Sequence, residues 1–350
     1  MVFGRIFFSF ALLLTLGCQD KSSPKVSFVE PPEQIDINLV VLSSLVLSSG
    51  DKSVLPVTAY GDRLLQRVNT LRRTSQHTAL VLLGNTFTTA ETSSAEDFLP
   101  LQDRAVSMTS FITQLSPLLI LRGKADLGIF ALPIERAAAT AKLPLLSPPK
   151  NPQPRYRLDS LLWNVSGFRI GLLGAPGSAS LELPSYVAGA AAMRAQGAKF
   201  IVALMADSVV LAKSFAEQLS GIDVVVAVAD EVTQPEVVDG TLIVGAPPLH
   251  SEAIGLLGLH RRGNGSWVFD AQSPRRAELL TTLAKTRLST SSNSPPSSKN
   301  EKEQTEETMA LSEVTTQPEG SFVTWQTELL STDAKEATWV RQEMLRSLKE

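Results

Sequence analysis

The sequence predicts an α/β fold in which buried strands alternate with surface helices. Apolar runs such as Thr78–Phe87 and Leu118–Phe130 pass into a glycine and a polar loop, which is how a buried strand of such a sheet presents its carboxyl end. Between them, Ala59–Arg73 carries apolar residues at helical spacing with arginines on the other face. In open α/β sheets, sites lie at the carboxyl ends of strands, so the loop after Leu118–Arg122 is the first candidate site.

Length and charge limit the possible classes of protein. The chain has 350 residues, of which 43% are hydrophobic and 19% charged, enough for one large or two ordinary globular domains. The formal charge of −3 gives no electrostatic reason to expect a nucleic-acid partner, so we expect no nucleic acid.

The N-terminus has the parts of a signal peptide, which we place at residues 1–17. Arg5 precedes the short apolar run Ile6–Leu14, and small residues follow before Cys18, the single cysteine. This arrangement resembles the lipobox of bacterial lipoproteins, in which a Cys after the cleavage site is lipidated, although Thr15 holds the place of the usual Leu. An ordinary buried thiol is the alternative reading of Cys18.

The resemblance to a lipobox also implies where in the cell the protein is located. Gln19 after the cysteine resembles the signal for the outer membrane, so we expect a protein of the bacterial envelope, anchored through Cys18 and facing the periplasm. Residues 18–34 mix charge, Ser and Pro without a period and predict a flexible tether.

The rest of the chain continues the alternation of strands and helices. A hairpin with the turn Ser166–Gly167 is expected. Strands are expected at Ile37–Leu47, Leu158–Val165, Phe168–Ala175, Lys199–Ser208, Gly221–Glu231, Gly240–Pro248, Ala253–Arg262, Gly265–Ala271 and Ser321–Leu330. Further helices are expected at Glu96–Ser116, Pro133–Leu145, Pro184–Gly197, Ser208–Leu219, Ser273–Leu288 and Asp333–Glu350, and 289–317 predicts a disordered or loosely helical insert.

The candidate loop reads G-K-A-D-L-G from Gly123 to Gly128 and resembles the G-N-H-D-x-G loop of the calcineurin-like metallophosphoesterases. The sequences of the predicted strands at Leu80–Phe87 and Gly221–Val228 extend the resemblance to the 5'-nucleotidase branch of this family. The resemblance covers about Ile35–Ala271. It implies a four-layer αββα sandwich of two facing mixed sheets with outer helices, whose strand ends meet at one cleft. We assign this domain to 35–288, with 318–350 docking on it. A generic doubly wound α/β domain is the alternative.

The resemblance also implies a two-metal site for phosphoester hydrolysis, and this chain departs from its ligand pattern. Asp126 matches the family loop. The family's metal ligands, in chain order Asp, His, Asp, Asn, His, His, His and His, fall on Ser44, Val46, Asn85, Lys124, Ala125, Ala206, Ala229 and Glu231.

Only Glu231 among these positions has a charged ligand group, so we expect no metal or other cofactor and no catalytic residues. The sequence favours a non-catalytic binding or scaffold module with an unknown protein or small-molecule partner. The alternative is a weak metal-dependent hydrolase of phosphoesters or 5'-nucleotides. We expect Lys124 to pair with Asp126 or Glu231 in place of the metals. The histidines, His77, His250 and His260, are expected at surfaces or strand edges.

Overall fold

The computed structural model describes residues 34–43, 45, 55–87, 108–128, 131–146, 159–175, 183–218, 220–229, 233–248, 253–263, 265–270 and 320–330. The signal peptide, Cys18, residues 18–33 of the expected tether and the insert at 289–317 lie outside these residues, as do the helices expected at Ser273–Leu288 and Asp333–Glu350. Gln34, the last residue of the expected tether, is instead the first residue of a strand. In the described part, no helix is both long and apolar enough to cross a membrane.

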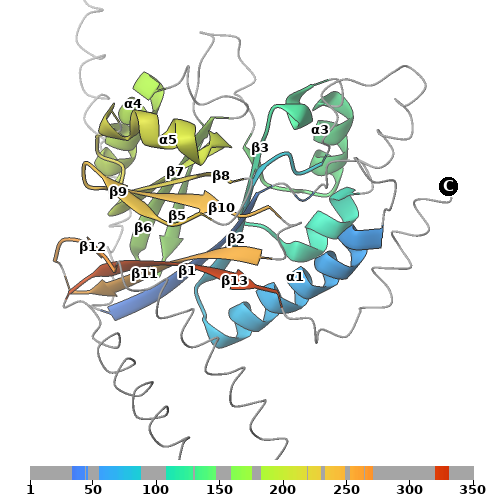
Figure 1. The fold of residues 1–350 in the computed structure, drawn as a ribbon, viewed down its shortest axis with the longest axis horizontal. Helices are drawn as coiled ribbons and strands as arrows, with labels where there is room; N and C mark the ends of the chain where they lie inside the picture. Colours follow the sequence, from blue (N-terminus) through green and yellow to red (C-terminus); the bar gives the residue numbers. More distant parts are fainter. Residues whose placement is uncertain are drawn as a thin grey trace, which may run out of the picture.

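One sheet has seven strands in the order β12-β13-β11-β1-β2-β3-β4 (Figure 1). The strands from β1 to β4 pair in parallel, whereas β11 is antiparallel to both β1 and β13. Their bounds are Gln34–Ser43 (β1), Thr78–Gly84 (β2), Leu119–Arg122 (β3), Leu145–Leu146 (β4), Ala253–Arg262 (β11), Val268–Phe269 (β12) and Phe322–Leu329 (β13). The strand expected near the C-terminus is therefore β13, which lies between β11 and β12.

The other sheet has six strands in the order β5-β6-β7-β8-β10-β9. The strands β6, β7, β8 and β10 are parallel, and β5 and β9 are antiparallel edges. Their bounds are Asp159–Val165 (β5), Phe168–Ala175 (β6), Phe200–Ser208 (β7), Val224–Val228 (β8), Glu236–Val238 (β9) and Thr241–Ala246 (β10). The predicted hairpin between β5 and β6 turns at Ser166 and Gly167, which both have positive φ, 49° and 84°, as a two-residue hairpin requires.

Helices cover the outer face of each sheet (Figure 1). The helix α1 (Leu55–Thr74), a helical segment at 108–115 and α3 (Ala131–Thr140) share one buried cluster with the outward side chains of the first sheet. The helices α4 (Leu183–Ala195) and α5 (Val209–Phe215) do the same on the second sheet. Two short 3₁₀ turns, Ala125–Leu127 (η1) and Ala216–Gln218 (η2), complete the described elements.

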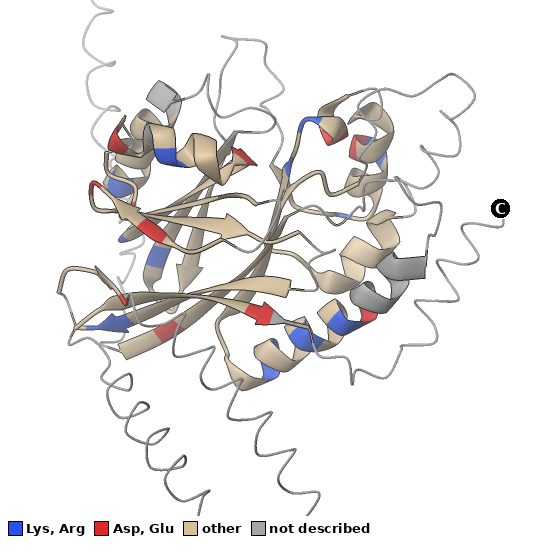
Figure 2. Ribbon diagram, in the orientation of Figure 1, with Lys and Arg blue, Asp and Glu red and all other residues tan. Residues whose placement is uncertain are grey.

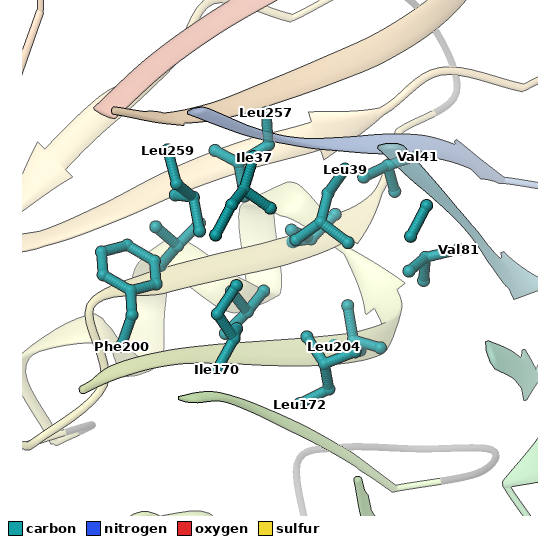
Figure 3. Packing of buried hydrophobic residues seen from close by; sticks show 14 of the residues in the cluster. Ile37, Leu39, Val41, Val81, Ile170, Leu172, Phe200, Leu204, Leu257 and Leu259 are labelled. Atoms are coloured by element: carbon teal, nitrogen blue, oxygen red, sulfur yellow. The ribbon is translucent and has the colours of Figure 1, made fainter. Parts of the chain in front are cut away.

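The largest apolar cluster lies between the two sheets (Figure 3). Alternate residues of β1, among them Ile37 and Leu39, point toward Ile170 and Leu172 of β6 across the interface, and all four are 1% exposed or less. Two sheets packed face to face, each covered by helices, form the four-layer αββα sandwich that the sequence predicts.

Three details differ from the sequence prediction. The helix expected at Pro133–Leu145 ends at Thr140, because Lys142 adopts a left-handed φ of 57° that stops the helix. Leu145–Leu146 instead pairs with β3 as the short edge strand β4, and β9 is also a strand that the sequence did not predict. The three strands expected at Gly240–Pro248, Ala253–Arg262 and Gly265–Ala271 resemble the closing meander of the metallophosphoesterase domain, but they do not form one, because β10 pairs in one sheet and β11 in the other.

A polar cluster lies where β1 and β11 pair, on the helix-facing side of the first sheet. Asp36 Oδ1 accepts hydrogen bonds from Arg262 Nη2 at 2.7 Å and His260 Nδ1 at 2.8 Å. Partial burial alone would raise the pKa of Asp36, but the hydrogen bonds and charges of His260 and Arg262 outweigh it and hold this pKa below its ordinary value of 3.8. Asp36 therefore stabilises the fold in its charged form.

This arrangement predicts a pH dependence of stability. A carboxyl whose pKa is lowered by folding stabilises the protein above its ordinary pKa and loses that effect as the pH falls through the folded value. We expect Asp36→Asn to be less stable than the wild type at pH 6, with the difference shrinking as the pH falls from about 4 toward 3. Urea unfolding of both proteins between pH 3 and 6 measures this. A difference that stays constant over the range would contradict the prediction.

Candidate functional site

The carboxyl ends of the two sheets meet at one place. Ser43, the last residue of β1, donates its hydroxyl to Ala246 O at 2.8 Å and its amide to Pro247 O at 2.9 Å. Ala246 is the last residue of β10 in the other sheet. The opposite, amino ends are closed by aromatic packing of Trp267 against Phe168 and Phe200. The polar loops that could carry chemistry are therefore at the Ser43 end, as the sequence predicts.

Two of these loops are tied together, and we call this contact the β2–β3 clasp, formed by residues 84–87 and 123–126. The amide of Gly123 donates to Gly84 O at 2.7 Å, and the amide of Ala125 donates to Asn85 Oδ1 at 3.1 Å. In the opposite direction, Asp126 accepts from the amides of Thr86 at 2.7 Å and Phe87 at 3.0 Å. Each loop thus supplies acceptors to the other.

The clasp depends on a glycine at position 123. A Cβ atom on Gly123 would lie 2.3 Å from Asn85 Oδ1 and 2.7 Å from the carbonyl carbon of Gly84. Backbone cannot move away as a flexible side chain can, so only glycine allows this approach. The closeness of Gly84 and Gly123, on which the sequence interpretation depends, is therefore present in the structure.

The predicted site residues on these loops differ in burial. Ala125 and Asp126 are buried, Asn85 is half-buried and Lys124 is exposed. Both carboxylate oxygens of Asp126 accept backbone amides, a role that the sequence analysis did not assign to it. The expected ion pair of Lys124 with Asp126 or Glu231 stays a prediction.

The remaining predicted positions belong to the second sheet or lie outside the described residues. Ala206 is half-buried near the end of β7, and Ala229 is buried just after β8, where its amide donates to Ala246 O at 3.1 Å. Both side chains are methyl groups and offer no donor atom to a metal. Ser44, Val46 and Glu231 lie outside the described residues.

The described residues do not fit a two-metal centre. Such a centre needs imidazole, carboxylate or amide ligands, and the described positions that match the family's ligands supply one amide oxygen, that of Asn85, which already accepts the Ala125 amide. The nearby carboxylate of Asp126 accepts the amides of Thr86 and Phe87. Nowhere in the described ranges do three or more His, Cys, Asp or Glu side chains gather in a way that could hold an ion.

The sequence analysis missed one residue beside this site, Arg122 at the end of β3. Its side chain is fully buried, and its Nη2 lies 3.0 Å from Glu135 Oε1 of α3. None of its three guanidinium nitrogens makes a hydrogen bond to a residue that the structure describes, so the contact with Glu135 is electrostatic. The signal was present, because Arg122 is a single charge at the end of the otherwise apolar run Leu118–Leu121.

The charged residues coloured in Figure 2 lie mainly on helices and on strands near their ends or at the edges of the sheets. The central strands β2, β8 and β10 contain no charged residue. Of the charged residues at the candidate site, Arg122 is the last residue of β3, and Lys124 and Asp126 lie in the loop that follows it.

Comparison with known proteins defines the fold. No protein-family model matches the sequence, and no curated protein matches it significantly. Among solved structures, a 5'-nucleotidase precursor from Thermus thermophilus superposes with a TM-score of 0.54 at 13% identity, covering 90% of this chain and 59% of that protein. NAD nucleotidase (NadN) from Haemophilus influenzae gives a TM-score of 0.48 at 13% identity, covering 67% of this chain and 49% of that protein.

This chain therefore has the αββα fold of the 5'-nucleotidase-like metallophosphoesterases. It spans about half to three fifths of the length of these two proteins. At 13% identity the likeness concerns the fold, and activity must be argued from the site itself.

The clasp predicts a specific sensitivity at Asp126. In Asp126→Asn, the amide group can accept with one oxygen only, so one of the buried amides of Thr86 and Phe87 loses its acceptor. We expect a loss of about 1–3 kcal/mol in the free energy of unfolding, measured by chemical denaturation. The matched control is Asp239→Asn, at an exposed turn position with a φ of 48° that Asn also adopts readily, with an expected change within about 0.5 kcal/mol. Equal effects of the two substitutions would refute the role of the clasp.

Proposed function

We propose that this protein is a non-catalytic member of the metallophosphoesterase fold that acts as a binding or scaffold module, attached to the membrane through a lipid on Cys18. The observation that carries the proposal is the donor set at the carboxyl ends of the strands. Ala125, Ala206 and Ala229 have no donor atoms, and Asn85 Oδ1 is engaged by a backbone amide.

Two-metal hydrolysis depends on several ligands at once. The cations must be held a few ångströms apart by imidazoles and carboxylates before they can activate a water and stabilise the leaving oxygen. Even changes beside the ligands typically reduce metal affinity or activity by about 10 to 100-fold. A site with a single neutral donor among its described positions is better suited to holding loops in place than to this chemistry.

The loops themselves support a binding role. In the clasp, hydrogen bonds between protein groups join the loops after β2 and β3 without any need for a cation. A surface that is rigid in the free protein loses little conformational entropy on binding, which favours recognition of a partner. The exposed Lys124 would present a positive charge on this surface.

A weak hydrolase is the second candidate, and the fold favours it. The solved structures with this fold include a protein described as a 5'-nucleotidase precursor, so the substrate in this alternative would be a 5'-nucleotide or another phosphoester. Ser44 and Glu231, together with residues of neighbouring loops, would then supply the missing ligands.

Metal content and turnover distinguish the two candidates. We expect the purified protein to contain far less than one Mn, Fe or Zn per chain, and to hydrolyse p-nitrophenyl phosphate and AMP no faster than an Asn85→Ala variant does. Elemental analysis and phosphate release measure these quantities, with circular dichroism to establish that the variant is folded. Stoichiometric metal together with turnover that Asn85→Ala abolishes would establish the hydrolase instead.

The anchor is tested separately. When the full chain is produced in a bacterial host, we expect it in the membrane fraction, and we expect Cys18→Ser to move it to the soluble periplasmic fraction. One acyl-modified cysteine is the only attachment in the proposal, so its removal should abolish membrane association. Unchanged partitioning of Cys18→Ser would show that something other than a lipid on Cys18 holds the protein at the membrane.

A further inference from the structure

Three strands place a carboxylate, an imidazole and a hydroxyl in one line on the first sheet. His260 of β11 lies between Asp36 of β1 and Thr324 of β13. Its Nδ1 is 2.8 Å from Asp36 Oδ1, and its Nε2 is 3.2 Å from Thr324 Oγ1. The three residues lie far from the β2–β3 clasp in the fold, at the amino end of β1, and the proposed function does not involve them.

The hydrogen-bonding roles follow from elementary chemistry. An ionised carboxylate can only accept, so His260 Nδ1 carries the hydrogen that Asp36 receives. In a neutral imidazole the other nitrogen then has a free lone pair, which the Thr324 hydroxyl, 3.2 Å away, can donate to. The carbonyl of Gly258 is a second acceptor for this hydroxyl at the longer distance of 3.5 Å. The hydroxyl of Thr324 is thereby polarised toward an oxyanion, with His260 positioned as its base and Asp36 as the group that orients the ring.

The surroundings hold this line in place. A Cβ atom on Gly258 would lie 2.3 Å from Thr324 Oγ1 and 2.7 Å from His260 Nε2, so the pair occupies the space that the glycine leaves. The ring of Phe322 stacks on His260 with centroids 4.6 Å apart. Arg262 donates to Asp36 at 2.7 Å, which favours the ionised carboxylate.

We propose that Thr324 is an acyl-acceptor site, which takes the acyl group of an activated ester with His260 as general base. Thr324 Oγ1 attacks the carbonyl carbon and passes its proton to His260 Nε2, the bond to the alcohol oxygen breaks, and the alcohol leaves with that proton. The product is an ester on Thr324. The three residues supply a nucleophile and a base, which suffice for one transfer from an activated ester, so we expect stoichiometric acylation rather than turnover.

The test treats the full chain with p-nitrophenyl acetate. The rate at which each residue is acetylated is measured by mass spectrometry of peptides. Thr70 is the internal reference, because it is an exposed residue of α1 and its hydroxyl donates to the carbonyl of Gln66 in the same helix at 2.9 Å. A positioned base typically contributes about 10²-fold or more, so we expect Thr324 to acetylate about 10²-fold faster than Thr70. The ratio should fall in acid, because a protonated imidazole has no nitrogen lone pair with which to accept the proton.

Variants show whether Thr324 reacts because His260 activates its hydroxyl or only because the hydroxyl is exposed to the reagent. We expect Thr324→Ser to keep the reaction at the same position, and His260→Gln to reduce acetylation of Thr324 to the rate of Thr70. Circular dichroism establishes that each variant is folded, and if His260→Gln does not fold, the pH dependence of the wild-type ratio decides. Acetylation of Thr324 at the rate of Thr70, or a rate unaffected by His260→Gln or by acid, would overturn the proposal.

Discussion

The burial of apolar side chains between the two sheets is the interaction on which the rest of this structure depends. This apolar cluster contains residues of strands between Ile35 and Trp325. Segments from most of the described chain must therefore come together before the cluster is shielded from water. The facing side chains also fix the register of the strands, because a shift by one residue would exchange the side chains that face the other sheet with those that face the helices. Once the sheets face each other in this register, their carboxyl ends meet, and Ser43 can bond to Ala246 of the other sheet.

The sequence was sufficient for most of the architecture, because its patterns report burial directly. Long apolar runs such as Thr241–Ala246 are buried on both faces, as strands covered by a sheet on one side and helices on the other must be. Positions of strands were predicted well for this reason. Their partners were not: β10 and β11 follow each other in the chain but belong to different sheets. An apolar sequence pattern does not show whether two consecutive strands pair in one sheet or belong to different sheets, because both arrangements need only a short connection and two buried strands.

The candidate site likewise has features that the sequence predicts and features that only the structure shows. The adjacency of Gly84 and Gly123 could be predicted, since both glycines end parallel strands that are neighbours in the sheet. The role of Asp126 could not, because a carboxylate in a loop is read equally well as a ligand, an ion-pair partner or an acceptor for backbone amides. Only the folded chain shows its two oxygens facing Thr86 and Phe87. Arg122 was overlooked because its pairing with Glu135 joins a strand to a helix, a contact without sequence periodicity.

The clasp explains how the loops of this fold can keep their shape independently of their chemistry. Gly123 is required by the approach of two backbones, whatever side chains follow it. Asp126 supplies acceptors for amides that would otherwise be buried without partners, which costs more than a typical hydrogen bond contributes. These constraints act on folding alone, so they hold whether or not metal ligands are present at positions 85 and 125. The part of the loop that resembles the metallophosphoesterases most, its glycine and aspartate, is thus the part that the fold itself needs, and a resemblance limited to such residues indicates fold more strongly than activity.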